Sequence, residues 1–138
     1  MKNKKISLFI DGASRGNPGP AGIGVLILDA AGKKIKEFYK YIGHTTNNVA
    51  EYNALIYALD EALMLKADEV IVNVDSELVA KQLNGEYRVK DETIKLFFEK
   101  ALHILKSFKN FEVNHIDRSR NKEADKLANK AINLAGME

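Results

Sequence analysis

Hydrophobic residues recur along the chain in two patterns, one typical of strands and one typical of helices. The apolar run ISLFI at residues 6–10 ends on Asp11 and predicts a first strand. A glycine-rich loop then leads into residues 22–43, where two apolar runs flank a turn near residues 30–33 and predict a hairpin. Because this loop leads into a strand and not a helix, a phosphate-binding loop of the nucleotide-binding type is not favoured.

The rest of the chain alternates between helical and extended patterns. Apolar residues at helical spacing predict a long helix within residues 45–67, and the run EVIVNVD at 69–75 predicts a buried strand. Helical patterns follow at 76–85 and 91–108, then the strand pattern FEVNHI at 111–116 and a closing helix at 121–135. The order β-β-β-α-β-α-α-β-α predicts an α/β fold, a mixed sheet with helices on both faces.

Composition narrows the class of protein without naming a function. The 138 residues suit one domain, 1–138, and the absence of cysteine excludes disulfides and thiolate metal sites. The net charge is only +2, so any site for a polyanion must be local. The N-terminal apolar run is too short for a signal peptide and no stretch is long enough to span a membrane. We therefore expect a cytoplasmic protein with no membrane partner.

Two aspartates follow apolar strands. Asp11 and Asp75 each stand at the carboxyl end of a predicted strand, the edge of an open α/β sheet where ligands bind. Each also has a purely structural interpretation. Asp75 could cap the helix that follows it, and Asp11 could begin an Asp-Gly turn.

Two further acids stand near the starts of helices. Glu51 falls on the same helical face as Leu55 and Ala58, the face expected to lie against the sheet. It could instead complete a capping box with Asn48. Asp125 borders the apolar side of the closing helix, although an acid in a first turn also stabilises the helix dipole.

The four acids together favour a metal site over four separate structural roles. Two strand ends and two helix starts can converge at one edge of a sheet, where carboxylates raise one another's pKa. Divalent cations relieve this repulsion, and all-oxygen ligation suits Mg²⁺ or Mn²⁺. A pair of such ions can bind the attacking water and the leaving oxygen of a phosphodiester. No covalent nucleophile is then needed.

Four segments resemble the type 1 ribonuclease H family. DGASRGNPGPAG, TTNNVAEYNAL, VNVDSELV and NKEADKLANKA occur in the order of that family's signature segments, and the resemblance covers about residues 5–135. It implies a five-stranded mixed sheet and an endonuclease that hydrolyses the RNA strand of RNA–DNA hybrids, leaving 5′-phosphate and 3′-hydroxyl ends. It also implies two Mg²⁺ or Mn²⁺ ions held by four catalytic acids: Asp11, Glu51, Asp75 and Asp125.

The same resemblance implies where the hybrid is bound. In the family the glycine-rich turn lies beside the metals and meets the minor groove, which displays the 2′-hydroxyls that distinguish RNA from DNA. Thr46 is implied to hold a DNA phosphate. The implied substrate-binding residues are Gly12, Ser14, Gly16, Asn17, Thr46, Asn47, Asn48 and Glu77. We expect a monomer, and whether duplex RNA is also bound and cut stays open.

The chain departs from the family pattern in two places. Many relatives carry a basic, aromatic-rich insertion after the second helix, which is absent here. Tyr87, Arg88 and Lys90 are either a small remnant of that surface or a solvated loop. Some relatives also have a long loop with a catalytic histidine before the final helix. Here the segment is short, and its basic residues either meet phosphate or form a solvated helix entry: Arg118, Arg120 and Lys122.

His115 lies near the position of that histidine but has a strand pattern. In FEVNHI it shares a face with Phe111 and Val113, so we expect a packed strand histidine and not a proton shuttle. The alternative function is a catalytically weak nucleic-acid-binding module on the same fold. A binder has no need of four mutually repelling acids, which argues against this alternative.

Overall fold

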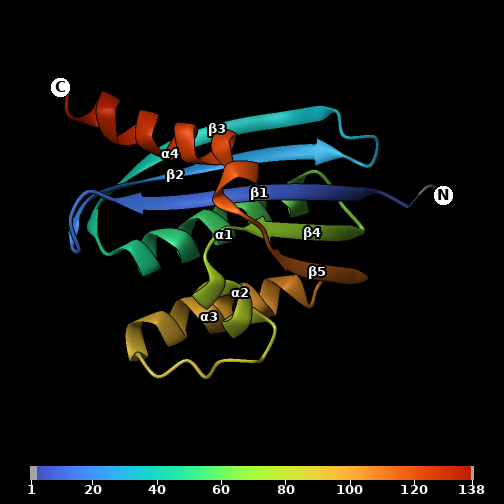
Figure 1. The fold of residues 1–138 in the computed structure, drawn as a ribbon. Coiled ribbons are helices and arrows are strands. Elements are labelled where there is room, and N and C mark those ends of the chain that lie inside the picture. Colours follow the sequence, from blue (N-terminus) through green and yellow to red (C-terminus); the bar gives the residue numbers. More distant parts are fainter. Residues whose placement is uncertain (1–2, 138) are drawn as a thin grey trace.

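A computed structural model, which describes residues 3–137, shows a five-stranded mixed sheet with helices on both faces (Figure 1). The sheet order is β3-β2-β1-β4-β5; β1, β2 and β3 are antiparallel, whereas β4 runs parallel to both β1 and β5. This confirms the predicted fold class and element order. The elements are β1 (Lys5–Ser14), β2 (Gly19–Asp29), β3 (Lys34–Thr45), α1 (Asn47–Met64), β4 (Glu69–Val74), α2 (Glu77–Leu83), α3 (Glu92–Leu105), β5 (Asn110–His115), the 3-10 helix η1 (Arg118–Arg120) and α4 (Lys122–Ala135).

The antiparallel pair β1–β2 extends further than the apolar residues of β1 predict. We expected β1 to end at Asp11, but it continues to Ser14, and the loop before β2 shortens to residues 15–18. The extension follows from antiparallel pairing, because Asp11 lies opposite Gly24 and Ser14 opposite Ala21. Backbone hydrogen bonds do not require apolar side chains, so the hydrophobic pattern ends before the strand does.

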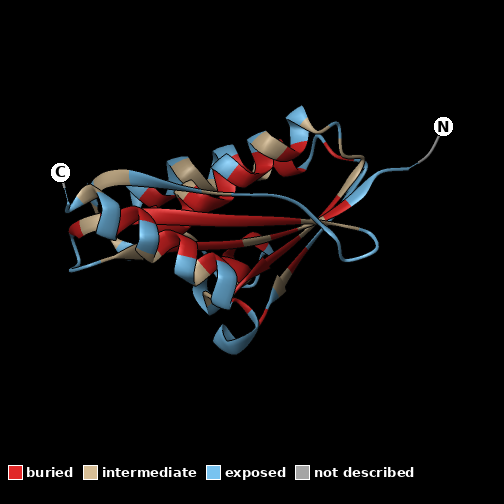
Figure 2. Ribbon diagram, turned by 90° about the horizontal axis from the view of Figure 1, so that it is seen from above, coloured by how far each residue is buried: buried red, intermediate tan, exposed pale blue. Residues whose placement is uncertain are grey.

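The main core lies between the sheet and α1. Alternate residues of β1 and β4 point to this face and are buried: Ile6, Leu8, Ile10, Val70, Val72 and Val74. The facing side of α1 is also buried, including Leu55 and Ala58, as its helical spacing predicted. Figure 2 shows this burial along the centre of the sheet and the inward side of the helices. The α1 helix, which carries Glu51, is thereby fixed against β1.

The opposite face of the sheet is covered by α4, which lies directly on β2. A Cβ atom added to Gly24 would stand 2.2 Å from the carbonyl oxygen of Ala124, far inside normal contact distance. Gly22 meets α4 one turn later, near the carbonyl oxygen of Ala128. The two glycines of β2 therefore allow the close approach that positions the first turn of α4 beside β1.

Two further features bear on the sequence-based expectations. Residues 84–91 connect α2 directly to α3, so the described chain has no helical insertion at this point, in agreement with its sequence. Among the helices between residues 3 and 137, none combines the length and apolar character needed to cross a membrane.

Candidate active site

The sheet register brings Asp11 and Asp75 together. The last parallel pair between β1 and β4 is Ile10 with Val74, and each aspartate is the next residue in its strand or just beyond it. Neighbouring strands lie about 4.8 Å apart, so the two carboxylates must be close. The expectation that both acids gather at the carboxyl edge of β4 is confirmed.

Glu51 reaches the same point from α1, and the capping-box interpretation of this residue is wrong. Thr46, not Asn48, caps α1, and its hydroxyl accepts a hydrogen bond from the Val49 N–H. Glu51 lies one turn further on, is buried, and its Oε1 accepts a 2.7 Å hydrogen bond from the Gly12 N–H. A glycine is required at 12, because a Cβ there would stand 2.2 Å from the Ala50 backbone.

Asp75 does not cap α2, contrary to its structural interpretation. Ser76 does so, because its hydroxyl accepts a hydrogen bond from the Val79 N–H. The Oδ2 of Asp75 instead accepts a 3.1 Å hydrogen bond from the amide of Asn121. The side chain is therefore held at the sheet edge, where it faces the other acids.

Asp125 completes the group from the first turn of α4. Its backbone oxygen and Oδ1 accept hydrogen bonds of 3.0 and 3.3 Å from the amide of Asn129, one turn later. A cavity of about 500 Å³ contains all four acids. The residues that line it are Asp11, Gly12, Ala13, Ser14, Asn47, Asn48, Glu51, Asp75, Ser76, Arg118, Asp125 and Asn129.

Three of these acids form a set suited to a divalent cation. Asp11, Glu51 and Asp75 can each present a carboxylate oxygen so that the three oxygens lie within 4.8 Å of one another. The Oε2 of Glu51 is buried and has no hydrogen-bond partner among the described residues. A buried carboxylate oxygen without a partner is costly, and an oxygen-seeking cation such as Mg²⁺ or Mn²⁺ would satisfy it.

Burial and mutual repulsion shift the protonation of the two most buried acids. Burial raises the pKa of Asp11 to about 7, and the negative charges of Asp75 and Asp125 add to the shift. Burial, followed by the charge of Asp11, raises the pKa of Glu51 well above its usual range. Without a cation, the cluster therefore holds protons that exposed carboxylates would lose, as carboxylates sharing one site are expected to do.

Six of the eight implied substrate-binding residues line two neighbouring cavities. Gly12, Ser14, Asn47 and Asn48 line the acid cavity. A second cavity, of about 560 Å³, is lined by Asn17, Thr45, Thr46, Asn47, Asn48, Val49, Asp91, Thr93 and Ile94. The two cavities share Asn47 and Asn48, so a single surface runs from the acids past the start of α1.

Hydrogen bonds between the glycine-rich loop and α1 fix that surface. The Ser14 N–H donates to Oδ1 of Asn47 at 2.9 Å, and the Asn47 N–H donates to Oδ1 of Asn17 at 3.1 Å. Gly16 has a φ of 111°, a conformation that favours glycine, and lines neither cavity. Glu77 also lies outside both; it is exposed and pairs with Lys81 at 3.0 Å.

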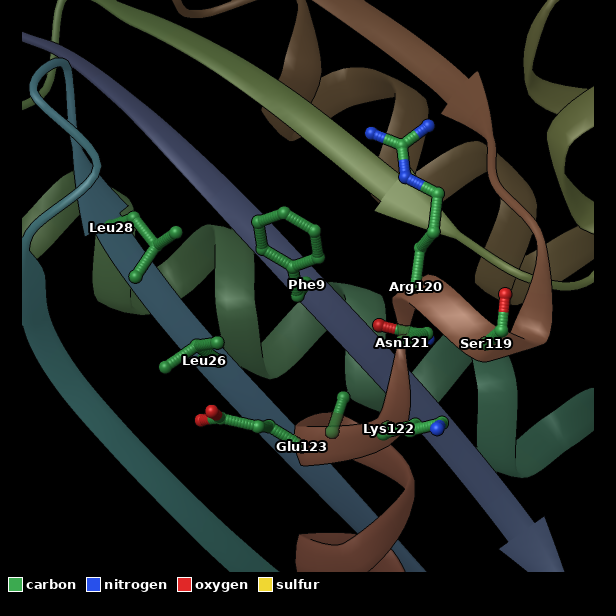
Figure 3. Close-up of a pocket in the computed structure, with 9 residues that line it drawn as sticks. Phe9, Leu26, Leu28, Ser119, Arg120, Asn121, Lys122 and Glu123 are labelled. Atoms are coloured by element: carbon green, nitrogen blue, oxygen red, sulfur yellow. The ribbon is translucent and has the colours of Figure 1, made fainter.

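The basic residues whose roles were left open lie at different places on the molecule. Arg118 lines the acid cavity, whereas Arg120 and Lys122 border a different hollow on the α4 side of the sheet (Figure 3). That hollow, of about 270 Å³, has an apolar floor of Phe9, Leu26 and Leu28 and contains none of the four acids. Tyr87, Arg88 and Lys90 are exposed, as a solvated loop would be.

The structure confirms the predicted strand position of His115 but not its predicted packing. It is the last residue of β5 and pairs with Val74, so it lies in the strand and on the face predicted. Its side chain is exposed, however, so the expected packing is wrong. The reason is that β5 is an edge strand and His115 is its end, where few neighbours remain to cover it.

Two asparagines of the site were missed. Asn121 hydrogen bonds to Asp75, and Asn129 hydrogen bonds to Asp125. A signal was present in the sequence, because Asn121, Asp125 and Asn129 are spaced four residues apart and lie on one helical face.

Several of the known proteins to which this chain is similar are ribonucleases H. Residues 9–131 match a family described as reverse transcriptase-like. A ribonuclease HI of Halobacterium salinarum is 39% identical over 131 residues, 95% of this chain and 66% of that protein. A ribonuclease H of Bradyrhizobium sp. is 33% identical over 147 residues, 96% of this chain and 93% of that protein.

Solved structures agree in fold. The crystal structure of LC11-RNase H1 in complex with an RNA/DNA hybrid is 48% identical, with a TM-score of 0.89 over 94% of this chain and 98% of that one. RNase H1 of Halobacterium salinarum gives a TM-score of 0.91 at 39% identity, over 94% and 98% of the two chains. Some relatives are longer, since the chain spans 37% of a bifunctional protein of Mycobacterium tuberculosis.

Proposed function

Because this chain belongs to the ribonuclease H family, we propose that it is a metal-dependent endonuclease that hydrolyses the RNA strand of RNA–DNA hybrids. The observation that supports this most directly is the acid cavity. It combines three convergent carboxylates with a buried Glu51 oxygen that has no described partner. Such a cluster destabilises a protein unless it binds a cation, so its presence favours catalysis over simple binding.

The residues suited to hold the metal are Asp11, Glu51, Asp75 and Asp125. Two Mg²⁺ or Mn²⁺ ions bound there would activate a water and stabilise the leaving oxygen, giving 5′-phosphate and 3′-hydroxyl ends. The hydrogen bond from Gly12 fixes one oxygen of Glu51, and the other, which is buried and has no described partner, would bind the metal. Arg118 lines the same cavity and would meet a phosphate of the substrate there.

The substrate surface extends from the acids toward the start of α1. Asn47 and Asn48 line both cavities, and an asparagine amide can donate to and accept from the 2′-hydroxyls of the minor groove. In the second cavity, Thr46 would hold a phosphate of the DNA strand, and Asn17 would meet the minor groove with the rest of the glycine-rich turn. The hybrid would then lie across both cavities, with its RNA strand over the acids.

The decisive experiment compares substrates and metals. Labelled RNA–DNA hybrid, duplex RNA and duplex DNA are incubated with Mg²⁺, Mn²⁺ or EDTA, and the product ends are identified by their response to phosphatase and ligase. We expect cleavage of the hybrid with either metal, none with EDTA, and ligatable 5′-phosphate ends. Binding of the hybrid without cleavage in any metal would contradict the proposal and favour a binding module.

Three narrower expectations belong to this proposal. The protein is a monomer, it works in the cytoplasm, and its main substrate is the hybrid and not duplex RNA. Gel filtration with light scattering tests the first and cell fractionation the second. Relative cleavage of the hybrid and duplex RNA tests the third.

A further inference from the structure

Asn121 occupies an unusual position for a polar residue. It links η1 to α4 and is 1% exposed (Figure 3). Asparagine is a favoured helix-capping residue, yet its side chain makes no capping bond to the described backbone of α4. Its backbone angles, φ −122° and ψ 24°, differ from the extended conformation of most capping residues. The side chain is therefore committed to something other than starting the helix.

The amide nitrogen of Asn121 joins two neighbouring strands. Nδ2 donates a 2.8 Å hydrogen bond to the Ile10 carbonyl oxygen and a 3.1 Å hydrogen bond to Oδ2 of Asp75. Both partners are acceptors, so the orientation of the amide is fixed; the flipped form would place its single oxygen against both acceptor oxygens. Both hydrogens of the NH₂ group are used, one for β1 and one for the carboxylate that follows β4.

The same residue also contacts the last acid through its backbone. The Asp125 N–H donates a 3.1 Å hydrogen bond to the Asn121 carbonyl oxygen. Asn121 thus contacts the residue before Asp11, the side chain of Asp75 and the backbone of Asp125. Apart from the four acids, no other described residue hydrogen bonds to three of the chain segments in which those acids lie.

We propose that Asn121 is a positioning residue for the metal-binding acids. This inference rests on the proposed function. By holding Oδ2 of Asp75, Asn121 fixes the carboxylate rotation and leaves Oδ1 free to act as a ligand. By holding the Ile10 carbonyl, it sets the distance between Asp75 and the adjacent Asp11. Partners of this kind orient metal ligands, and their removal typically costs about 10- to 100-fold in metal affinity or activity.

The test measures metal binding directly. Calorimetric titration with Mn²⁺ compares the parent, Asn121→Ala and Asn121→Ser, at a temperature where circular dichroism shows each protein folded. Asn121→Ala should lose about tenfold or more in Mn²⁺ affinity. Asn121→Ser keeps one donor and should lose less. Cleavage by Asn121→Ala should require correspondingly more metal and recover toward the parental kcat when metal is saturating.

Asn73→Ala is the matched control. Asn73 is also buried, and its Nδ2 donates to a β1 carbonyl, that of Leu8, at 3.3 Å, but its described side-chain hydrogen bonds include none to the four acids. It should lose stability and keep the parental Mn²⁺ affinity. Parental affinity in a folded Asn121→Ala, or an equal loss in Asn73→Ala, would overturn this proposal alone. A parent protein that binds no Mn²⁺ would overturn the proposed function together with it.

Discussion

Asp11 shows how a single carboxylate can oppose the stability of the fold that contains it. It is 6% exposed and lies among three other acids, so its charge is largely removed from solvent. Among the residues lining the cavity, the only basic side chain is that of the exposed Arg118. Burial and the neighbouring charges account for a pKa of about 7. The presence of a carboxylate at this position is therefore best explained by the cation that it would bind. Its substitution should affect function and stability differently.

Asp11→Asn should abolish cleavage without unfolding the protein. The amide has the same shape but cannot serve as an anionic ligand, so activity should fall by more than the roughly 100-fold typical of a lost supporting residue. Without metal the variant should melt at or above the parental temperature, because carboxylate repulsion is relieved. Mg²⁺ should raise the melting temperature of the parent more than that of the variant.

The control is Asp60→Asn, the same change at an exposed position of α1. It should keep both parental cleavage and the parental response to Mg²⁺. Near-parental cleavage by Asp11→Asn would contradict the assignment of Asp11 as a ligand.

The raised pKa of Asp11 also predicts the pH dependence of stability. A carboxyl whose pKa rises from its usual 3.8 to about 7 on folding binds its proton more tightly in the folded state. The contribution of this group to the stability of the metal-free protein should therefore be complete below pH 3.8, and the free energy of unfolding should fall as the pH rises from there through about 7. Urea unfolding in EDTA across this range measures the slope. Asp11→Asn should flatten it, and an identical slope in parent and variant would exclude Asp11 as its source.

His115 tests whether a proton shuttle is needed at the end of β5. Its side chain is exposed, so His115→Ala should change stability by no more than about 0.5 kcal/mol. We expect the single-turnover cleavage rate to fall by less than about tenfold, since general acid–base groups typically contribute about 100-fold or more. His103→Ala, at an exposed position of α3, is the control. A loss of about 100-fold in folded His115→Ala would make His115 the shuttle.

At the scale of the elements, the contact between β2 and α4 determines where Asp125 lies. Gly24→Ala would place a methyl group 2.2 Å from the Ala124 carbonyl oxygen, next to Asp125 in sequence. We expect a loss of about 1–3 kcal/mol in the free energy of unfolding, the usual cost of overpacking. Because α4 must move away from the sheet, metal-dependent cleavage should fall as well. Urea unfolding and initial cleavage rates measure the two effects.

Gly136→Ala provides the comparison for that change. Gly136 follows α4, and a Cβ there would meet its neighbours at 3.6 Å or more, an ordinary contact. This variant should match the parent in stability and activity. If Gly24→Ala also matched the parent, the close approach of α4 to β2 would not be what positions Asp125.

Several elements of the site could be predicted because local and tertiary signals coincide. Asp75 follows an apolar strand, and Glu51 lies on the apolar face of α1, so periodicity alone places both at the sheet. The extension of β1 to Ser14 could not be predicted, because it depends on pairing with β2. The hydrogen bonds of Asn121 likewise depend on the docking of η1 and α4 beside β1 and β4.

At the scale of the whole molecule, the direct connection between α2 and α3 limits the surface available to a duplex. The connection, residues 84–91, is short, and its basic side chains are exposed to solvent. Hybrid binding should therefore be weak and only shallowly dependent on salt, because each phosphate contact adds roughly 0.7–0.9 to the slope of log affinity against log salt. A relative that carries the basic insertion should show a steeper slope in the same binding assay.

Single substitutions sharpen this comparison. Arg118→Ala should reduce the slope by about one contact, roughly 0.7–0.9, since Arg118 borders the acid cavity. Arg88→Ala, in the connecting residues, should leave the slope unchanged. A parental slope steeper than that of the insertion-bearing relative would point to a basic surface elsewhere on the molecule.

The parallel pairing of β1 with β4 has a consequence for how the protein folds. The acids come from β1, α1, the end of β4 and α4, which are separated by long stretches of chain. Contacts between distant segments form late, because closing the large loops between them costs conformational entropy before the contacts can stabilise the chain. A partly folded chain consequently lacks the full set of ligands. The proposed cleavage of RNA would therefore require the complete fold, and a partly folded chain would be inactive.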